Sequence, residues 1–132
     1  DKEASFITGL GTPVGEPGWR RVWIALDEQG AIAGHIDLRA RPERPASHRA
    51  MLGMGVDRAH RKQGLGARLM QIALTWARDE ANIEWVDLEV LSVNRAARDL
   101  YERSGFTTIG EMPDMFRIDG ESHAYTLMTR RS

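Results

Sequence analysis

The stretch RKQGLGARL, from Arg61 to Leu69, decides the fold: three basic side chains surround two glycines that are one residue apart. It follows an apolar run that ends at Val56, and a helical pattern begins within it at Gly64. Backbone N–H groups at the start of a helix bind anions, and Gly64 and Gly66 carry no side chain that would keep a phosphate away. The stretch is therefore a phosphate cradle, a basic helix start whose glycines serve only packing, or a nucleic-acid-binding patch.

Two familiar phosphate-binding loops do not match these letters. A Walker loop ends in Gly-Lys followed by Ser or Thr, which is absent here, and the dinucleotide-binding fingerprint requires a third glycine where this chain has Leu69. A nucleic-acid patch requires basic residues over a wider face and exposed aromatic side chains, and neither accompanies this turn in the sequence. The phosphate cradle and the packing motif both stay open on this pattern alone.

The composition narrows the remaining classes of protein. The chain has 132 residues, the size of one compact domain, and 18 Lys and Arg against 19 Asp and Glu give a formal net charge of −1. No global positive field attracts nucleic acid or an anionic membrane. There is no cysteine, which excludes disulfides, zinc–thiolate sites and a cysteine nucleophile. No apolar run approaches the roughly 18 residues of a membrane span, so we expect a cytoplasmic domain without a membrane partner.

Alternating apolar residues predict strands before this stretch. Residues 20–40 alternate on both sides of a polar turn, which indicates a β-hairpin. Residues 49–56 are typical of a third, buried strand that Gly53 and Gly55 interrupt. These two glycines indicate either a bulge that leaves backbone groups free to face a ligand, or tight packing of a helix against the strand.

The pattern after the stretch alternates between helix and strand. The period is helical over residues 64–81, residues 83–91 alternate as a half-buried strand, and Asn94 is a candidate N-cap for a helix over residues 95–104. Gly105 stands where a left-handed residue ends a helix. The apolar face expected for the first helix comprises Leu65, Leu69, Ile72, Ala73 and Trp76.

The tail of the chain repeats the grammar of a hairpin. It predicts a strand over residues 106–112, a loop, a strand over residues 115–118, an Asp119–Gly120 turn and a last strand over residues 122–130. The order βββαβαββ indicates an α/β (α+β) fold with a mixed sheet flanked by helices.

Two blocks together resemble the signatures of the GNAT superfamily of acyl-CoA-dependent N-acyltransferases. Arg61-Lys62-Gln63-Gly64-Leu65-Gly66 resembles the motif Q/R-x-x-G-x-G/A, and LEVLSVNRAARDLYERSGF, from Leu88 to Phe106, resembles the family's strand, Asn, helix with a Tyr, then Gly-Phe. The resemblance covers roughly residues 48 to 128. It implies one GNAT domain over residues 1–132, with a mostly antiparallel twisted sheet and a V-shaped splay between its two central strands. The family's N-terminal strand and helices are missing or reduced in this chain.

The same resemblance implies acetyl-CoA as the cofactor, bound in the splay. The backbone of the third strand would pair with the pantetheine amides, and one N–H there would polarise the thioester carbonyl. The amides of the glycine turn would hold the pyrophosphate, with the basic side chains as supporting charge. The implied cofactor-binding residues are Met54, Gly55, Val56, Arg61, Lys62, Gln63, Gly64, Leu65, Gly66, Ala67, Asn94 and Tyr101. Asn94 is a helix cap, a cofactor contact or both.

Direct transfer requires a neutral amine and a proton for the departing thiolate. An alkyl amine with a pKa of about 10.4 must give up its proton at neutral pH, which costs on the order of 4 kcal/mol. Tyr101 matches the family's tyrosine and is the candidate general acid, its alternative role being a core aromatic. The third strand lacks the Glu that many relatives carry, so we assign His48 as the base or proton relay, with His35, Glu89 and His123 as further candidates. The four histidines lack the spacing of metal ligands, and we expect no metal.

These residues predict an N-acetyltransferase that moves the acetyl group of acetyl-CoA to a primary amine by direct attack. The acceptor is a small-molecule amine or a protein N-terminal amine. The alternative is a non-catalytic acyl-CoA-binding module of the same fold, which the absent strand carboxylate and the short front end favour. Exposed strand edges in the closing hairpin predict a homodimer, and no nucleic acid is expected as a partner.

Overall fold

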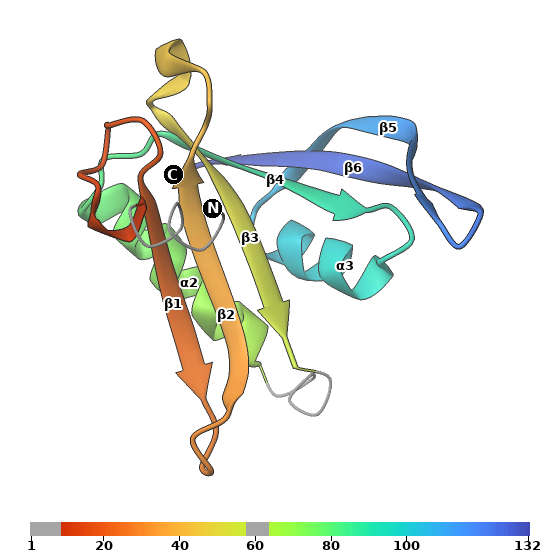
Figure 1. Cartoon of the computed structure of the whole chain (residues 1–132), viewed down its shortest axis with the longest axis horizontal. Coiled ribbons are helices and arrows are strands. Elements are labelled where there is room, and N and C mark those ends of the chain that lie inside the picture. Colours follow the sequence, from red (N-terminus) through yellow and green to blue (C-terminus); the bar gives the residue numbers. More distant parts are fainter. Residues whose placement is uncertain (1–8, 58–63) are drawn as a thin grey trace.

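The computed structural model describes residues 9–57 and 64–132. Its strands and helices follow the predicted order (Figure 1). Their bounds are β1 (Arg20–Leu26), β2 (Ile32–Ala40), the 3-10 turn η1 (Arg44–Ala46), β3 (Arg49–Val56), α2 (Leu65–Asp79), β4 (Trp85–Leu91), α3 (Arg95–Arg103), β5 (Thr107–Ile118) and β6 (Glu121–Arg131).

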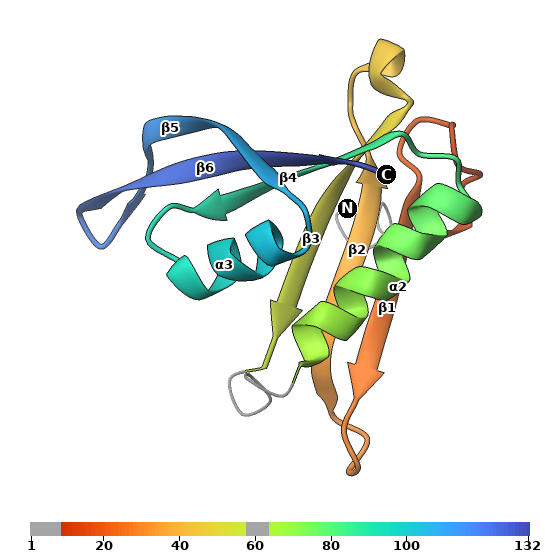
Figure 2. The same cartoon turned by 180° about the vertical axis from the view of Figure 1, so that it is seen from behind.

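One sheet holds all six of these strands, in the order β1-β2-β3-β4-β6-β5. β3 and β4 pair in parallel and every other neighbouring pair is antiparallel, which confirms the mixed, mostly antiparallel sheet. The parallel pair is joined through α2, as a parallel connection requires a crossover. Figure 2 shows α2 lying across the β1–β2 side of the sheet and α3 beside it.

The core lies between these helices and one face of the sheet. Alternation places Ile36, Leu38, Leu52 and Leu88 on this face, and all four side chains are buried. α2 packs on the same face, because a Cβ added at Gly34 would lie 3.2 Å from Cδ1 of Leu69. The opposite face of the sheet carries the remaining strand side chains and is the more polar one. We call it the open face.

The apolar face predicted for α2 is partly wrong. Leu69 and Ala73 are buried as expected, but Ile72 is 49% exposed. The helix buries three residues that the prediction omitted, namely Met70, Leu74 and Ala77. Ile72 is displaced because α2 crosses the sheet near its edge strand, where Ile72 and Trp76 extend beside Trp23 of β1.

The predicted helix ends around α3 are confirmed. The side chain of Asn94 accepts a hydrogen bond of 3.2 Å from the backbone N–H of Ala97, which is the expected N-cap contact. Gly105 follows α3 with a φ of 93°, in the left-handed region expected at its C-terminal end.

β5 is longer than the sequence predicted. The two short strands and the loop between them form a single strand, with register irregularities at Thr108/Gly110 and Met112/Phe116. The second irregularity contains Pro113 and Asp114, and the latter has a φ of 50°. Proline and a residue with positive φ typify a loop in sequence, but an edge strand accommodates them as a bulge.

β3 and β4 diverge after a short parallel contact. Pairing runs only from Arg49↔Trp85 to Met51↔Asp87. Beyond it, β3 follows β2 as far as Val56, whereas β4 follows β6 as far as Leu91. The two strands therefore form a V (Figure 1), which confirms the predicted splay.

Candidate active site

The edge of β3 that borders the splay carries backbone groups that point away from β2. The N–H of Asp57 donates to the carbonyl of Ala33 at 2.8 Å, which marks this directly opposed pair as hydrogen-bonded. Opposed pairs in an antiparallel ladder alternate between hydrogen-bonded and non-hydrogen-bonded. The backbone N–H and C=O groups of Met54 and Val56 are therefore directed toward β4, into the splay. This edge suits an extended chain that carries amide groups.

The first turn of α2 supplies backbone donors beside this edge. Gly64 has a φ of 76°, and an added Cβ would meet no atom within 4 Å, so its role here is conformational. The first bond within the helix runs from the N–H of Arg68 to the carbonyl of Gly64. The preceding N–H groups of Leu65, Gly66 and Ala67 have no acceptor one helical turn back, and such groups bind anions. Arg61, Lys62 and Gln63 lie outside the described residues.

Gly66 serves close packing where three elements meet. A Cβ added there would lie 3.0 Å from Cδ2 of Leu100 in α3, 3.6 Å from Cε of Met54 and 3.8 Å from Cγ2 of Val56. The absence of a side chain therefore brings the first turn of α2 against β3 and α3 at the splay. The packing interpretation applies to Gly66, and it places the orphan N–H groups beside the β3 edge.

Tyr101 lies on the helix side of the splay. It follows Leu100 in α3, and the whole residue is only 7% exposed. Its ring packs edge-on against Phe106, with centroids 6.1 Å apart. Burial raises the pKa of the Tyr101 hydroxyl, so this group stays protonated at neutral pH and remains able to donate a proton. Asn94, three residues after the end of β4, caps α3 as described above.

Gly53 and Gly55 have a role on the open face that the sequence did not reveal. The expected bulge is wrong, because β2 and β3 pair in continuous register from Gly34↔Val56 to Ala40↔Ala50. A Cβ at Gly53 would lie 2.8 Å from Oδ1 of Asp37, and one at Gly55 would lie 2.9 Å from Cε1 of His35. The glycines thus let these two side chains of β2 lean across β3 toward the splay.

The candidate bases fall into two groups. His35 leans over Gly55, and Glu89 lies on the open face of β4 two residues past the last paired rung, so both border the splay. His48 lies at the closed end, where its carbonyl accepts from the N–H of Glu84 at 2.9 Å. It precedes Gly55 by seven positions of extended chain, roughly 23 Å.

His123 is also remote from the splay. It pairs with Phe116 near the tip of the β5–β6 hairpin, and its Nε2 lies 3.8 Å from a carboxylate oxygen of Glu121. The structure therefore brings two of the four candidate bases to the site.

A buried ion-pair cluster lies at the vertex of the splay. Asp87 of β4 accepts hydrogen bonds from Nε and Nη2 of Arg49 at 2.9 and 2.6 Å, and from Oγ1 of Thr129 at 2.7 Å. Nη1 of Arg41 donates to the same carboxylate at 3.2 Å. Burial works to raise the pKa of Asp87, but the hydrogen bonds from Arg49 and Thr129 and the two arginine charges outweigh it. The pKa of Asp87 is therefore lowered.

The sequence analysis missed this cluster. Its only signal was a lone acidic residue in the half-buried strand segment VDLEV. Nothing in the sequence pattern identified the partners, which come from three other parts of the chain.

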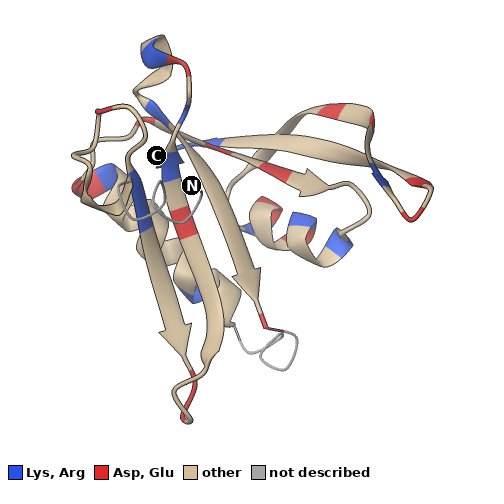
Figure 3. Ribbon diagram, in the orientation of Figure 1, with Lys and Arg blue, Asp and Glu red and all other residues tan. Residues whose placement is uncertain are grey.

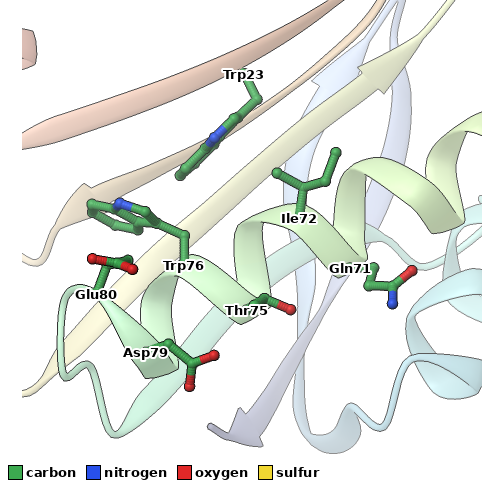
Figure 4. A pocket seen from close by; sticks show the side chains of 7 residues that line it. All are labelled: Trp23, Gln71, Ile72, Thr75, Trp76, Asp79 and Glu80. Carbon is green, nitrogen blue, oxygen red and sulfur yellow. The ribbon is translucent and has the colours of Figure 1, made fainter.

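A separate hollow of about 470 Å³ lies on the helix side of the edge strand (Figure 4). Trp23 of β1 and Trp76 of α2 form its aromatic wall, with ring centroids 5.3 Å apart. Ile72, Asp79 and Glu80 also line it. Because β2 separates β1 from β3, this hollow is distinct from the splay.

Two further searches bear on the chemistry of the site. Among the described residues, no cluster of three or more His, Cys, Asp or Glu side chains is arranged to hold a metal ion. Within the same residues, the helices are too short or too polar to cross a membrane.

Comparison with known proteins shows the same family from its sequence. The chain matches the model of the acetyltransferase (GNAT) family over residues 12–106. It is 31% identical over 100 residues to the N-terminal acetyltransferase A complex catalytic subunit NAA10 of Arabidopsis thaliana, covering 76% of this chain and 52% of that protein. It is 32% identical over 105 residues to N-alpha-acetyltransferase RimI of Mycobacterium tuberculosis, covering 80% and 63% respectively. The chain thus spans about half to just under two thirds of the length of these relatives.

Solved structures agree. An acetyltransferase of the GNAT family from Streptococcus pneumoniae has a TM-score of 0.80 and 25% identity, covering 86% of this chain and 67% of that one. A GCN5-related N-acetyltransferase from Kribbella flavida has a TM-score of 0.78 and 26% identity, covering 100% and 77%. With the splayed strands and the glycine turn, these matches establish that the chain belongs to the GNAT acetyltransferase family.

Proposed function

We propose that this chain is an acetyl-CoA-dependent N-acetyltransferase that acetylates a primary amine by direct attack. One observation carries the proposal: β3 and β4 diverge beside the first turn of α2. The divergence leaves an amide-pairing edge, and the helix start supplies unbonded N–H groups for a diphosphate. The family match over residues 12–106 supports the same activity.

Acetyl-CoA would lie between the diverging strands. Its pantetheine amides would pair with the backbone of β3 from Met54 to Val56, and one N–H there would polarise the thioester carbonyl. Its diphosphate would bind the N–H groups of Gly64 to Ala67, with Arg61, Lys62 and Gln63 assigned to the same end by sequence alone. Asn94, beyond the end of β4, would contact the cofactor while it caps α3.

The amine approaches from the open face and the thiolate leaves toward the helices. The amine nitrogen attacks the thioester carbon, the C–S bond breaks, and the CoA sulfur takes a proton from the Tyr101 hydroxyl. Because burial raises the pKa of Tyr101, this hydroxyl is protonated at neutral pH and can serve as the acid.

The proton of the ammonium requires an acceptor on the open face. We assign it to His35 in place of His48, because the His35 imidazole lies over Gly55 at the splay whereas His48 lies at the closed end. An imidazole ordinarily titrates about 4 units below an alkyl amine and a carboxylate about 6 units below, so the imidazole is the less uphill acceptor. Glu89 supplies negative charge on the facing strand and attracts the ammonium.

The acceptor, location and assembly are proposals of the same kind. The relatives are named as an N-terminal and an N-alpha-acetyltransferase, which supports an α-amine of a protein N-terminus or of a small molecule. We propose a cytoplasmic location. We also propose a homodimer through β5, an edge strand with exposed apolar side chains such as Ile109, Met112 and Phe116.

Calorimetry with acetyl-CoA and an assay of thiol release test the activity. Tyr101→Phe is expected to bind acetyl-CoA as the wild type does and to lose about 10²–10⁴-fold in kcat. A wild type that binds acetyl-CoA but releases no thiol with any amine would identify the non-catalytic binding module instead. Failure to bind acetyl-CoA would overturn both functions.

A further inference from the structure

A hollow of about 400 Å³ lies on the open face of the β1–β2 hairpin. Its polar wall is formed by Arg20 of β1 with Asp37 and Arg39 of β2. None of these three side chains has a role in the chemistry proposed above. The hollow is on the opposite side of the sheet from α2, since Gly34, which alternates with His35, faces Leu65 and Leu69.

The hollow extends to the splay across two glycines. Asp37 and Arg39 both reach over Gly53, where an added Cβ would lie 2.8 Å from Oδ1 of Asp37 and 3.3 Å from Nη1 of Arg39. His35 lies over Gly55 in the same way. Gly53 and Gly55 belong to the segment of β3 that no longer pairs with β4. A molecule held in the hollow by Arg39 is thus one strand away from the predicted thioester.

The charge of the hollow favours an anion. Arg20 and Arg39 stand directly opposite each other in the β1–β2 register, an arrangement of like charges that destabilises a strand pair (Figure 3). Asp37 contacts Arg39 through one pair of atoms, Nη1 and Oδ2, at 3.4 Å. A guanidinium has five donors and binds a carboxylate best through two of them, so this contact leaves capacity for a second carboxylate.

The other wall of the hollow is aliphatic. Ile24 and Ile32 line it and are 55% and 61% exposed, and Val22 lies beside them. Exposed aliphatic side chains that line a hollow next to charged groups provide contact for an apolar substituent. The hollow therefore combines one anion-binding side with one apolar side.

We propose that this hollow is the acceptor subsite and that it selects an α-amine with a carboxylate close to it and an aliphatic side chain. Arg39, supported by the field of Arg20, binds the carboxylate, while Ile24 and Ile32 contact the side chain. The amine then points over Gly53 and Gly55 toward the splay. The carboxylate is that of a free amino acid or of an acidic side chain next to a peptide N-terminus. Two opposed arginines disfavour polyamines. This inference rests on the proposed function.

Binding of acceptors to the complex with CoA tests the subsite without turnover. The probes are L-leucine, L-leucinamide and spermidine, together with two peptides that begin Leu-Glu and Leu-Gln. We expect Arg39→Gln to weaken the binding of the preferred carboxylate probe at least tenfold and to leave L-leucinamide unchanged. Asp37→Asn, which removes the competing carboxylate, should strengthen it. Arg44→Gln, which removes an exposed charge outside the hollow, is the matched control and should change neither.

The two peptide and amino-acid pairs distinguish the sources of the carboxylate. Preference for L-leucine over its amide identifies a free amino acid, and preference for Leu-Glu over Leu-Gln peptides identifies a protein N-terminus. Equal binding of both members in both pairs, or tighter binding of spermidine, overturns the subsite. Acetyl transfer to these probes without dependence on Arg39 overturns the subsite but leaves the proposed function standing. Preferred, Arg39-dependent binding of a carboxylate probe without any thiol release leaves the subsite standing and overturns the proposed function.

Discussion

Arg49 of β3 holds Asp87 of β4 through Nε at 2.9 Å and Nη2 at 2.6 Å, across the three-rung contact from which the two strands diverge. The ion pair therefore ties the strands together at the vertex of the cofactor splay. The side chain of Asp87 is only 10% exposed, so the carboxylate depends on these donors rather than on water.

Removing the charge of Asp87 should loosen this vertex. We expect Asp87→Asn to lower the free energy of unfolding by about 1–3 kcal/mol, because the buried donors of Arg49 lose their charged acceptor. Urea unfolding at neutral pH measures this change. Asp79→Asn, which breaks the exposed pair with Arg78, is the matched control and should leave stability unchanged. Equal stability of both variants would show that the cluster does not hold the vertex.

The same residue predicts a dependence of stability on acid. The pKa of Asp87 is lower in the folded protein than its ordinary value of 3.8, so its contribution is fully present above that value and is lost as the pH falls through the folded pKa. The stability difference between wild type and Asp87→Asn should therefore be constant near neutral pH and shrink below about pH 4. A difference that grows on acidification would contradict the assignment.

Gly66 should tolerate no branched side chain. Gly66→Val forces a side chain against Leu100, Met54 and Val56, and we expect it to cost about 1–3 kcal/mol of stability and to weaken acetyl-CoA binding. Adding Leu100→Ala should restore part of both losses, which a double-mutant cycle measures. Gly11→Val serves as control, since an added Cβ at Gly11 meets nothing within 4 Å.

The glycines of β3 should control acceptor chemistry rather than cofactor binding. Gly55→Ala places a methyl group 2.9 Å from Cε1 of His35 and must displace the imidazole. We expect kcat/KM for the amine to fall while the acetyl-CoA affinity is kept. His35→Gln should lose about 10²–10⁴-fold in kcat and flatten the acid limb of its pH profile. If Glu89→Gln rather than His35→Gln has this effect, the proton acceptor is Glu89.

The raised pKa of Tyr101 is open to direct titration. The chain has two tyrosines, so the absorbance of tyrosinate in the wild type minus that in Tyr101→Phe isolates Tyr101. Because burial disfavours the charged form, the difference titration should have its midpoint above the ordinary value of 10.0. A midpoint below that value would show an environment that stabilises the tyrosinate, which is inconsistent with a role as general acid.

The sequence predicted most of the elements but few of the contacts between them. Periodicity located β1 to β4 and both helices, and the Asn94 cap and Gly105 are local signals that need no tertiary information. The splay came from the family resemblance. The role of Gly53 and Gly55 could not be predicted, since it depends on the β2–β3 register that places Asp37 and His35 over them.

The position of the base was beyond the sequence for a related reason. His48 and His35 lie in adjacent predicted strands, and only the extent of the β3–β4 pairing shows which end of β3 is closed. The partners of Asp87 are separated from it by up to 46 positions, so no local pattern joins them.

Amide hydrogen exchange with and without acetyl-CoA tests the central claim, that the cofactor binds in the splay with its diphosphate on the first turn of α2. Acetyl-CoA should slow exchange at Met54, Gly66 and Ala67 and leave the edge strands β1 and β5 unaffected. Protection that is confined to the Trp23–Trp76 hollow, or that is absent from β3 and the first turn of α2, would contradict the account.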